Sequence, residues 1–155
     1  MGGVLKYLSF QGRANRQRYW LTSLALAGLI VASVIVVTVL AGAFAVLGML
    51  GLPVFAAVFW AGLSNGARRL HDRNKSAWWL MLFMVLPGVL SGLGQAMMGM
   101  SQTSEGDAAG GAVLVLLGLP LSIWAFVEMG CLKGTAGPNR YGADPLAPPL
   151  QEVFA

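Results

Sequence analysis

The stretch that decides the fold covers residues 19–67 and reads YWLTSLALAGLIVASVIVVTVLAGAFAVLGMLGLPVFAAVFWAGLSNGA, without a charged residue. A transmembrane helix needs about 20 apolar residues and seldom uses more than about 25. The stretch is therefore too long for one membrane span and long enough for two. We expect the chain to turn near residues 41–44, because a second helix that began after Pro53 would be short before Arg68. Pro53 then falls inside the second helix, where it predicts a kink.

The composition of the whole chain agrees with lipid as its main solvent. Of the 155 residues, 57% are hydrophobic and 10% are charged, whereas a soluble domain carries about 25% charged residues. The net charge of +4 comes from ten Lys and Arg residues that gather in short clusters beside the apolar runs. Such clusters are typical of cytoplasmic loops under the positive-inside rule and not of a nucleic-acid surface. The single cysteine, Cys131, excludes an intrachain disulfide.

Basic and non-basic segments alternate along the chain. The N-terminal segment and residues 68–76 are basic, the turn near 41–44 is neutral, residues 96–110 carry Glu105 and Asp107, and the C-terminal segment carries Lys133 and Arg140. Four transmembrane helices, with both termini in the cytoplasm, place every basic segment on the same side. We therefore predict an all-α, polytopic membrane protein. Three spans are the alternative, but they would put Lys133 and Arg140 outside.

The expected helices lie at about residues 20–41, 44–67, 77–94 and 111–130, within one membrane domain over residues 1–145. The remaining residues, 146–155, are expected to form a disordered tail. Asn15 is a good residue to cap the first helix. If the second helix continues past Ala67, Arg68 and Asp72 lie four residues apart on one face and could form a capping ion pair.

Three segments are more polar than membrane anchoring requires. They are residues 10–20, FQGRANRQRYW, residues 68–79, RRLHDRNKSAWW, and residues 133–145, KGTAGPNRYGADP. We call them the first, second and third polar motifs. If four spans are correct, all three motifs face the cytoplasm and gather at one boundary between membrane and water.

In order and spacing, the three motifs resemble the bacterial family catalogued as domain of unknown function 805, the YhaH-type small membrane proteins. That family has a Phe-x-Gly-Arg…Arg…Tyr-Trp start, an Arg-Arg-Leu-His-Asp…Ser…Trp-Trp centre and a Gly-Thr…Gly-x-Asn-Arg-Tyr-Gly…Asp-Pro end. The resemblance implies an integral inner membrane protein without an assigned reaction. The family usually has Gly where this chain has Asn74, and both residues tolerate a left-handed helix C-cap. Shorter relatives lack the segment at 96–110.

The polar motifs supply the candidate ligand-binding or lipid-binding residues. These are Arg13, Arg16, Arg68, Arg69, His71, Asp72, Asn139, Arg140 and Asp144. Polar groups at the membrane boundary must find partners, so the set either pairs internally as a structural lock or surrounds a ligand. Because arginines outnumber carboxylates, a ligand would be anionic, such as a lipid headgroup or a phosphorylated metabolite. Glu128 is a further, intramembrane polar candidate.

Three functions fit these residues. The first is a non-enzymatic membrane protein whose cytoplasmic Arg-rich cluster binds anionic lipid or a partner protein. The alternative is a small oligomeric transporter or channel, which Glu128 and the prolines at 53, 87 and 120 would support. An enzyme that uses His71 and Asp72 lacks an activated nucleophile. We expect no cofactor, no metal site and no nucleic-acid partner, whereas GxxxG pairs at 62–66 and 88–92 leave a homo-oligomer or a membrane protein partner open.

Overall fold

The computed structural model describes residues 8–43, 51–100 and 105–147 of the chain. In these residues the backbone forms long helices and no strand, apart from one isolated bridge between Asn139 and Gly142. The helices are α2 (Arg16–Ala43), α4 (Gly51–Asp72), α5 (Leu86–Met100) and α6 (Glu105–Phe126). A π-helical turn, η1 (Met81–Val85), precedes α5, and another, η2 (Val127–Cys131), follows α6. The prediction of an all-α polytopic membrane protein is confirmed.

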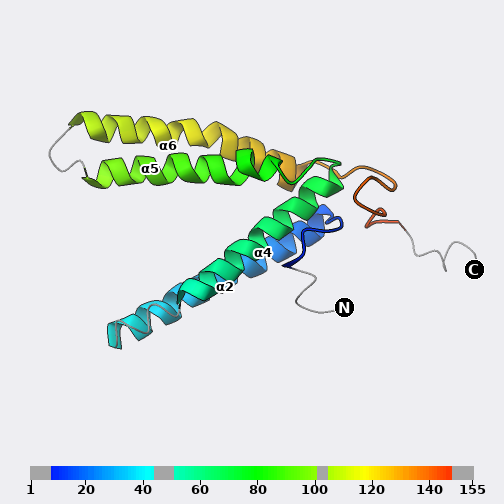
Figure 1. Cartoon of the computed structure of the whole chain (residues 1–155), viewed down its shortest axis with the longest axis horizontal. Helices are drawn as coiled ribbons and strands as arrows, with labels where there is room; N and C mark the ends of the chain where they lie inside the picture. Colours follow the sequence, from blue (N-terminus) through cyan, green and yellow to red (C-terminus); the bar gives the residue numbers. More distant parts are fainter. Residues whose placement is uncertain (1–7, 44–50, 101–104, 148–155) are drawn as a thin grey trace, which may run out of the picture. The chain divides into compact units, whose positions relative to one another are not determined.

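The chain divides into two compact units. One unit contains Met1–Lys75 together with Lys133–Ala155, and the other contains Ser76–Leu132. The first unit holds the hairpin of α2 and α4 with the C-terminal segment, and the second holds the hairpin of α5 and α6 (Figure 1). All three polar motifs therefore belong to the first unit, except for the last four residues of the second motif.

In the described part of the chain, three helical segments are long and apolar enough to cross a membrane, namely Arg16–Leu40, Met81–Gly99 and Asp107–Cys131. The remaining helix, α4, is uncharged only over residues 51–67, which corresponds to about 25 Å of helix at about 1.5 Å per residue. This length approaches the hydrocarbon thickness of a bilayer, about 30 Å. α4 packs against α2, so its short apolar part lies beside a longer apolar helix.

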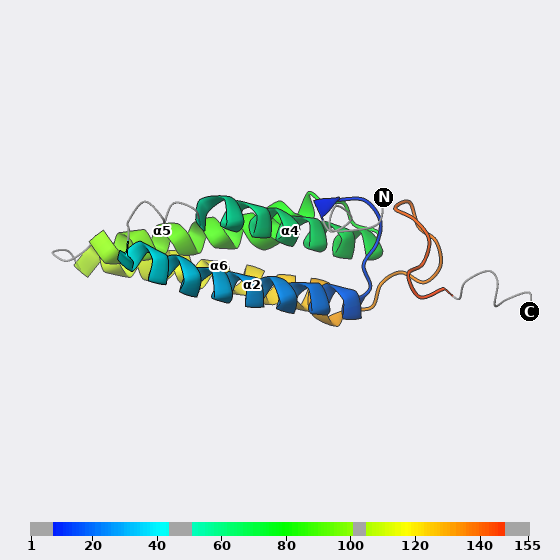
Figure 2. The ribbon, with the colours of Figure 1, turned by 90° about the horizontal axis from the view of Figure 1, so that it is seen from below.

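Helices α2 and α4 run antiparallel and side by side (Figure 1 and Figure 2). At one end, Gly51 packs against the side chain of Val37. At the other end, the backbone N–H of Ala14 donates to the carbonyl of Arg68 at 3.0 Å. Between them the buried Asn65 Nδ2 donates to the Tyr19 carbonyl at 3.1 Å. Interhelical hydrogen bonds of this kind stabilise helix pairs in lipid, where each unpaired polar group is costly.

The surface of α2 is apolar on all sides, because lipid surrounds most of it. Large side chains such as Leu24, Val31, Ile35 and Val39 are exposed in the isolated chain. A helix that is hydrophobic all round is typical of a membrane span. The polar residues Ser33 and Thr38 each donate a hydrogen bond to a carbonyl one turn earlier in the same helix, so neither hydroxyl is left unpaired in the membrane.

The described residues before α2 lie against α4. Trp60 Nε1 donates to the Leu8 carbonyl at 3.1 Å, and Ser64 Oγ donates to the Ser9 carbonyl at 2.6 Å. Side chains of α4 thus pair with backbone carbonyls of this segment. Non-helical backbone is tolerated at membrane depth only when protein covers it in this way.

In the second unit, two glycines allow α5 and α6 to approach closely. A Cβ added to Gly94 would lie 2.5 Å from the Gly111 carbonyl oxygen, and a Cβ added to Gly111 would lie 2.5 Å from the Gly94 carbonyl oxygen. The GxxxG pair predicted at 88–92 does not contribute here, because added Cβ atoms at Gly88 and Gly92 would meet nothing within 4 Å. An aromatic cluster packs near the other end of the hairpin, with Phe83 and Trp124 ring centroids 5.1 Å apart.

The expected helices at 77–94 and 111–130 correspond to 81–100 and 105–131, including the π-helical turns. The turn expected near 41–44 falls at the end of α2 and on residues 44–50, which lie outside the described residues. Pro53 lies in the first turn of α4 as described, and Pro120 lies inside α6. The single membrane domain over 1–145 stays a prediction, and the expected tail at 146–155 lies outside the described residues from 148 onward.

Candidate functional site

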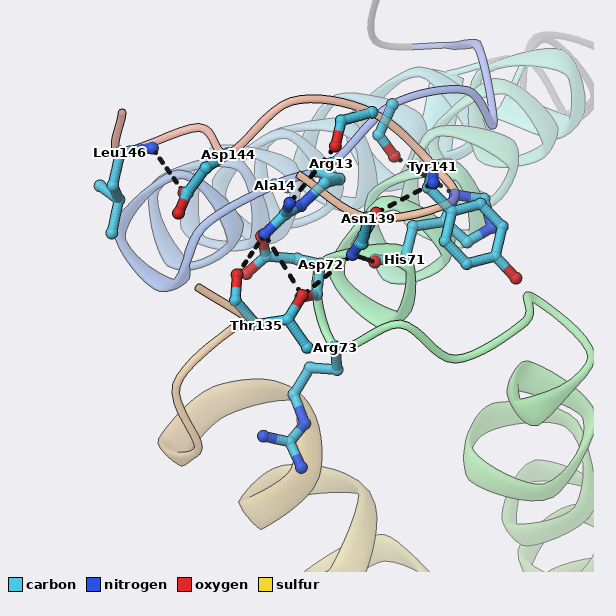
Figure 3. A network of polar contacts seen from close by, with 12 residues as sticks. Arg13, Ala14, His71, Asp72, Arg73, Thr135, Asn139, Tyr141, Asp144 and Leu146 are labelled. Atoms are coloured by element: carbon cyan, nitrogen blue, oxygen red, sulfur yellow. Dashed lines mark hydrogen bonds and ion pairs between the residues drawn. The ribbon is translucent and has the colours of Figure 1, made fainter. Parts of the chain in front are cut away.

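The three polar motifs meet in the first unit and form one hydrogen-bonded cluster, which we call the motif junction (Figure 3). The segment before α2 brings Arg13. The C-terminal end of α4 brings Arg69, His71 and Asp72, and the coil after residue 132 brings the third motif. The sequence places these residues far apart, and the antiparallel packing of α2 and α4 brings the first two motifs together.

Asp72 lies at the centre of the motif junction and binds all three motifs. Its Oδ1 accepts a hydrogen bond from Arg13 Nε at 3.1 Å, and its Oδ2 accepts one from Arg69 Nη1 at 2.6 Å. Its backbone carbonyl accepts from the backbone N–H of Thr135 at 2.8 Å and from Thr135 Oγ1 at 2.9 Å. The three ion-pair side chains are at most 3% exposed. A buried carboxylate is tolerated when it is paired and hydrogen-bonded on both oxygens.

The ion pair within α4 differs from the one that the sequence suggested. The helix does continue past Ala67 to Asp72 as expected. Within α4, however, Asp72 pairs with Arg69 three residues earlier, whereas the sequence suggested Arg68 four residues earlier. Arg68 Nε instead donates to the Ser64 carbonyl at 3.3 Å. Both spacings lie on one helix face, so only the packed structure decides between the two arginines.

Arg13 directs the rest of its guanidinium into the third motif. Nη1 donates to the Gly137 carbonyl at 2.6 Å and Nη2 donates to the Thr135 carbonyl at 2.6 Å. The planar fork of a guanidinium suits several acceptors in one plane. Arg13 is 8% exposed, so its charge serves the contacts inside the motif junction. It acts as a structural lock between the first and third motifs.

Glycines in the third motif are required by close approach and by backbone conformation. A Cβ added to Gly134 would collide with the carboxylate of Asp72. Gly137 has φ +74°, a left-handed conformation that L side chains adopt only with strain. These two glycines explain why the coil can lie flat against the end of α4.

His71 is held between the first and third motifs. Its ring stacks on the ring of Tyr141, with centroids 3.8 Å apart and planes 5° from parallel. Its Nδ1 lies 3.2 Å from the Gly12 carbonyl and donates to it in the tautomer that carries hydrogen on Nδ1. Burial lowers the pKa of His71 below its usual value; the hydrogen bond to Gly12 opposes that change, and the positive charge of Arg140 adds to it.

The end of α4 is closed by a Schellman motif. Asn74 has φ +58°, its N–H donates to the His71 carbonyl, and the N–H of Lys75 donates to the Leu70 carbonyl. This is the hydrogen-bond pattern of a left-handed C-cap, and Asn tolerates it almost as well as Gly. The positive φ of Asn74 confirms the left-handed C-cap expected at this position. Arg140 Nη2 donates to the Asn74 carbonyl at 3.0 Å and ties the third motif to this cap.

Asn139 and Asp144 shape the third motif itself. Asn139 Nδ2 donates to the His71 carbonyl at 2.9 Å. Asp144 accepts hydrogen bonds from the backbone N–H groups of Leu146 at 2.9 Å and of Gly137 at 2.8 Å. These two hydrogen bonds, that of Leu146 first, lower the pKa of Asp144 below its usual value. Asp144 therefore holds the coil as a compact turn.

Two of the predicted site residues, Arg16 and Glu128, are placed differently from the residues of the motif junction. Asn15 caps α2 as expected, because its Oδ1 accepts from the backbone N–H of Arg18 at 2.9 Å. Arg16, the first residue of α2, is exposed. Glu128 is buried in η2 and belongs to the second unit.

Sequence reasoning did not single out Thr135 and Tyr141, although both lie in the third motif. Thr135 binds Asp72 and Arg13, and Tyr141 covers His71. The Gly-Thr and Arg-Tyr-Gly steps of the motif were the available signal, but their partners could not be assigned from spacing. Among the described residues, no three His, Cys, Asp or Glu side chains gather in a way that could hold a metal ion.

The helices and the motif junction define a small polytopic α-helical membrane protein with a conspicuously basic first unit. The described part of that unit contains nine Lys and Arg residues and only two carboxylates, Asp72 and Asp144. Residues 7–143 match the model of the family described as "Protein of unknown function (DUF805)". The chain belongs to this family, and it is a multi-pass protein of the bacterial inner membrane.

Curated relatives cover almost the whole chain. The inner membrane protein YhaI of Escherichia coli (strain K12) is 32% identical over 148 residues, which are 92% of this chain and 91% of the relative. The inner membrane protein YhaH of the same strain is 29% identical over 160 residues, 94% of this chain and 95% of the relative. The uncharacterized protein YiiR of that strain is 28% identical over 136 residues, 88% and 85% of the two chains. No solved structure gives a significant match.

Proposed function

We propose that this inner membrane protein is non-enzymatic and binds the headgroups of anionic phospholipids through its basic first unit, on the cytoplasmic side. The observation that carries the proposal is the charge balance of that unit, with nine Lys and Arg residues against two carboxylates in its described part. Both carboxylates already accept hydrogen bonds inside the protein. This excess of cations over carboxylates supports an anionic ligand.

Some arginines and lysines of the first unit are buried and others are exposed, which supports a ligand as well as a lock. Arg13 and Arg69 are buried and serve the motif junction. Arg16, Lys133 and Arg140 are exposed. We call these three the exposed cations. Phosphate groups are recognised by such side chains through charge-assisted hydrogen bonds.

The position of the exposed cations suits a lipid headgroup. Arg16 begins a helix whose apolar part is long enough to cross the membrane. Lys133 lies close to the end of α4, because its carbonyl accepts a hydrogen bond from Arg73 Nη1 at 2.7 Å. Arg140 donates to the cap of the same helix. A basic side chain near an anionic membrane surface contributes about 1 kcal/mol of attraction.

The contacts of His71 and Asp72 favour a non-enzymatic role. Asp72 uses both carboxylate oxygens in ion pairs. The ring of His71 is stacked on Tyr141 and its Nδ1 lies at the Gly12 carbonyl. A general base needs access to a substrate proton, and these two side chains are instead engaged with their own chain.

The proposal can be tested with the lipids that remain bound to the purified protein. The full-length protein and a variant with Arg16→Gln, Lys133→Gln and Arg140→Gln are purified in a mild detergent, and their lipids are measured by mass spectrometry. We expect the variant to lose most of its anionic phospholipid and to keep its zwitterionic lipid. Asp107→Asn, an exposed charge change in the second unit, is the control. Equal anionic lipid in all three proteins would refute the proposal, and a protein that co-purifies only with the wild type would identify a protein partner instead.

A further inference from the structure

A cavity of about 320 Å³ lies beside the motif junction, between the start of α2 and the third motif. Its charged lining residues are Arg16, Asp72, Lys133 and Asp144, and Asn15 and Thr135 also line it. All these residues belong to the first unit. A volume of this size matches the lower end of small-molecule sites, about 300–1,000 Å³.

Cations outnumber carboxylates in and around the lining of the cavity, when the two arginines that pair with Asp72 are included. The carboxylate of Asp72 is already paired with Arg13 and Arg69. Arg16 and Lys133 come from different segments of the chain and both are exposed. Two cations on opposite segments provide a place for an anion with several oxygen atoms, such as a phosphate. The backbone N–H groups in the first turn of α2 add to the same preference.

The carboxylate of Asp144 makes the cavity selective among phosphates. Each of its oxygens accepts one backbone N–H, from Gly137 and from Leu146, and each carboxylate oxygen can accept a second hydrogen bond. A bare phosphate would meet an unfavourable negative charge there. A phosphate ester whose alcohol part carries a hydroxyl or ammonium group would instead donate to it.

We propose that this cavity binds a phosphate ester whose alcohol part carries hydroxyl or ammonium donors, with the phosphate between Arg16 and Lys133 and a donor at Asp144. The inference rests on the proposed function and assigns it a site and a chemical class. The same chemistry occurs in a phospholipid headgroup and in a soluble phosphate ester, and the two sources are separated by experiment.

The experiment measures lipid binding to the full-length protein by native mass spectrometry in detergent. Phosphatidylglycerol, whose headgroup carries hydroxyls, is titrated against phosphatidylcholine, whose headgroup has no hydrogen-bond donor. Arg16→Gln and Lys133→Gln remove cations that line the cavity, and Arg140→Gln removes an exposed cation that does not line it. We expect phosphatidylglycerol to bind better than phosphatidylcholine and each cavity variant to weaken it by about tenfold or more, the effect of losing one charged hydrogen bond. Arg140→Gln should weaken binding by less, about fivefold or less, because a cation at the membrane surface contributes less than a charged hydrogen bond inside a site.

The other outcomes separate this site from the proposed function. Equal losses in all three variants would keep the binding of anionic lipid by the basic unit and overturn the cavity as its site. No loss in any variant would overturn both. Soluble glycerol phosphate that displaces phosphatidylglycerol supports the cavity, whereas binding of glycerol phosphate without binding of the lipid assigns the site to a soluble ester. Arg16→Lys, which keeps the charge, should retain binding and shows that a loss in Arg16→Gln is not caused by misfolding.

Discussion

The guanidinium of Arg13 lies 3.1 Å from the carboxylate of Asp72, although the two residues are 59 positions apart in the chain. The pair joins the segment before α2 to the end of α4, and the same guanidinium reaches two carbonyls of the third motif. The three polar motifs thus supply the residues that form one buried set of contacts. Arg16, Lys133 and Arg140, in contrast, are exposed.

Arg13→Gln should destabilise the protein far more than Arg16→Gln. Loss of Arg13 leaves the carboxylate of Asp72, which is 3% exposed, with one cation, and breaking a buried ion pair costs about 3–5 kcal/mol. Arg16 is exposed, and substitution of an exposed side chain changes stability by about 0.5 kcal/mol or less. Thermal unfolding of both variants in detergent measures the difference. Equal stabilities would contradict the burial of Arg13.

Gly134→Ala should loosen the C-terminal segment from α4. The added Cβ would collide with the carboxylate of Asp72, so that either the segment or the two ion pairs of Asp72 must move. We expect faster cleavage of this segment in limited proteolysis and a lower melting temperature. Gly28→Ala is the matched control, because a Cβ there meets nothing within 4 Å. If both variants behave alike, Gly134 does not lie against Asp72.

Acidification should weaken the contact between His71 and the third motif. The pKa of His71 is lowered in the folded protein, mainly by burial, so the unfolded chain binds the proton more readily than the folded one. The contribution of His71 to the stability of the fold is therefore fully present above the ordinary pKa of about 6.5. It decreases as the pH falls through that value toward the lowered folded pKa. His71→Gln should remove this part of the pH dependence in thermal unfolding, and an unchanged slope would count against it.

Asn65→Ala should weaken the α2 and α4 hairpin modestly. Asn65 Nδ2 donates to the Tyr19 carbonyl and to Ser23 Oγ, and interhelical hydrogen bonds in lipid contribute about 0.6–2 kcal/mol. Ser33→Ala is the control, because Ser33 Oγ bonds a carbonyl of its own helix. Unfolding with increasing denaturing detergent compares them. A larger effect at Ser33 would contradict the packing of α4 on α2.

The sequence was sufficient for the membrane fold and for local helix ends. The uncharged stretch at 19–67, the cap at Asn15 and the left-handed Asn74 follow from length, side-chain chemistry and backbone sterics, which act over a few residues. The burial of Arg13 and the exposure of Arg16 could not be predicted in this way. They lie three positions apart in one basic motif, and only the packing of α4 and the third motif against the first decides which is buried. Packing likewise decides that Asp72 pairs with Arg69 and not, as the sequence suggested, with Arg68.

The packing of the segment before α2 against α4 could not be predicted from sequence patterns either. Its carbonyls are satisfied by Trp60 and Ser64, and both residues look like ordinary members of an apolar helix in the sequence. Hydrogen bonds between residues far apart in the sequence depend on how the tertiary structure brings the two segments together. The spacing of residues in the sequence does not show this.

The measurement that tests the central claim most directly is a double-mutant cycle on Arg13 and Asp72. The free energy of unfolding is measured for the wild type, Arg13→Gln, Asp72→Asn and the double variant of the full-length protein. If the two residues form the buried contact that joins the motifs, the double variant should be less destabilised than the sum of the single variants, with a coupling of about 1–3 kcal/mol. Additive effects, with a coupling near zero, would show that the first and second motifs do not meet, and the motif junction would then be wrong.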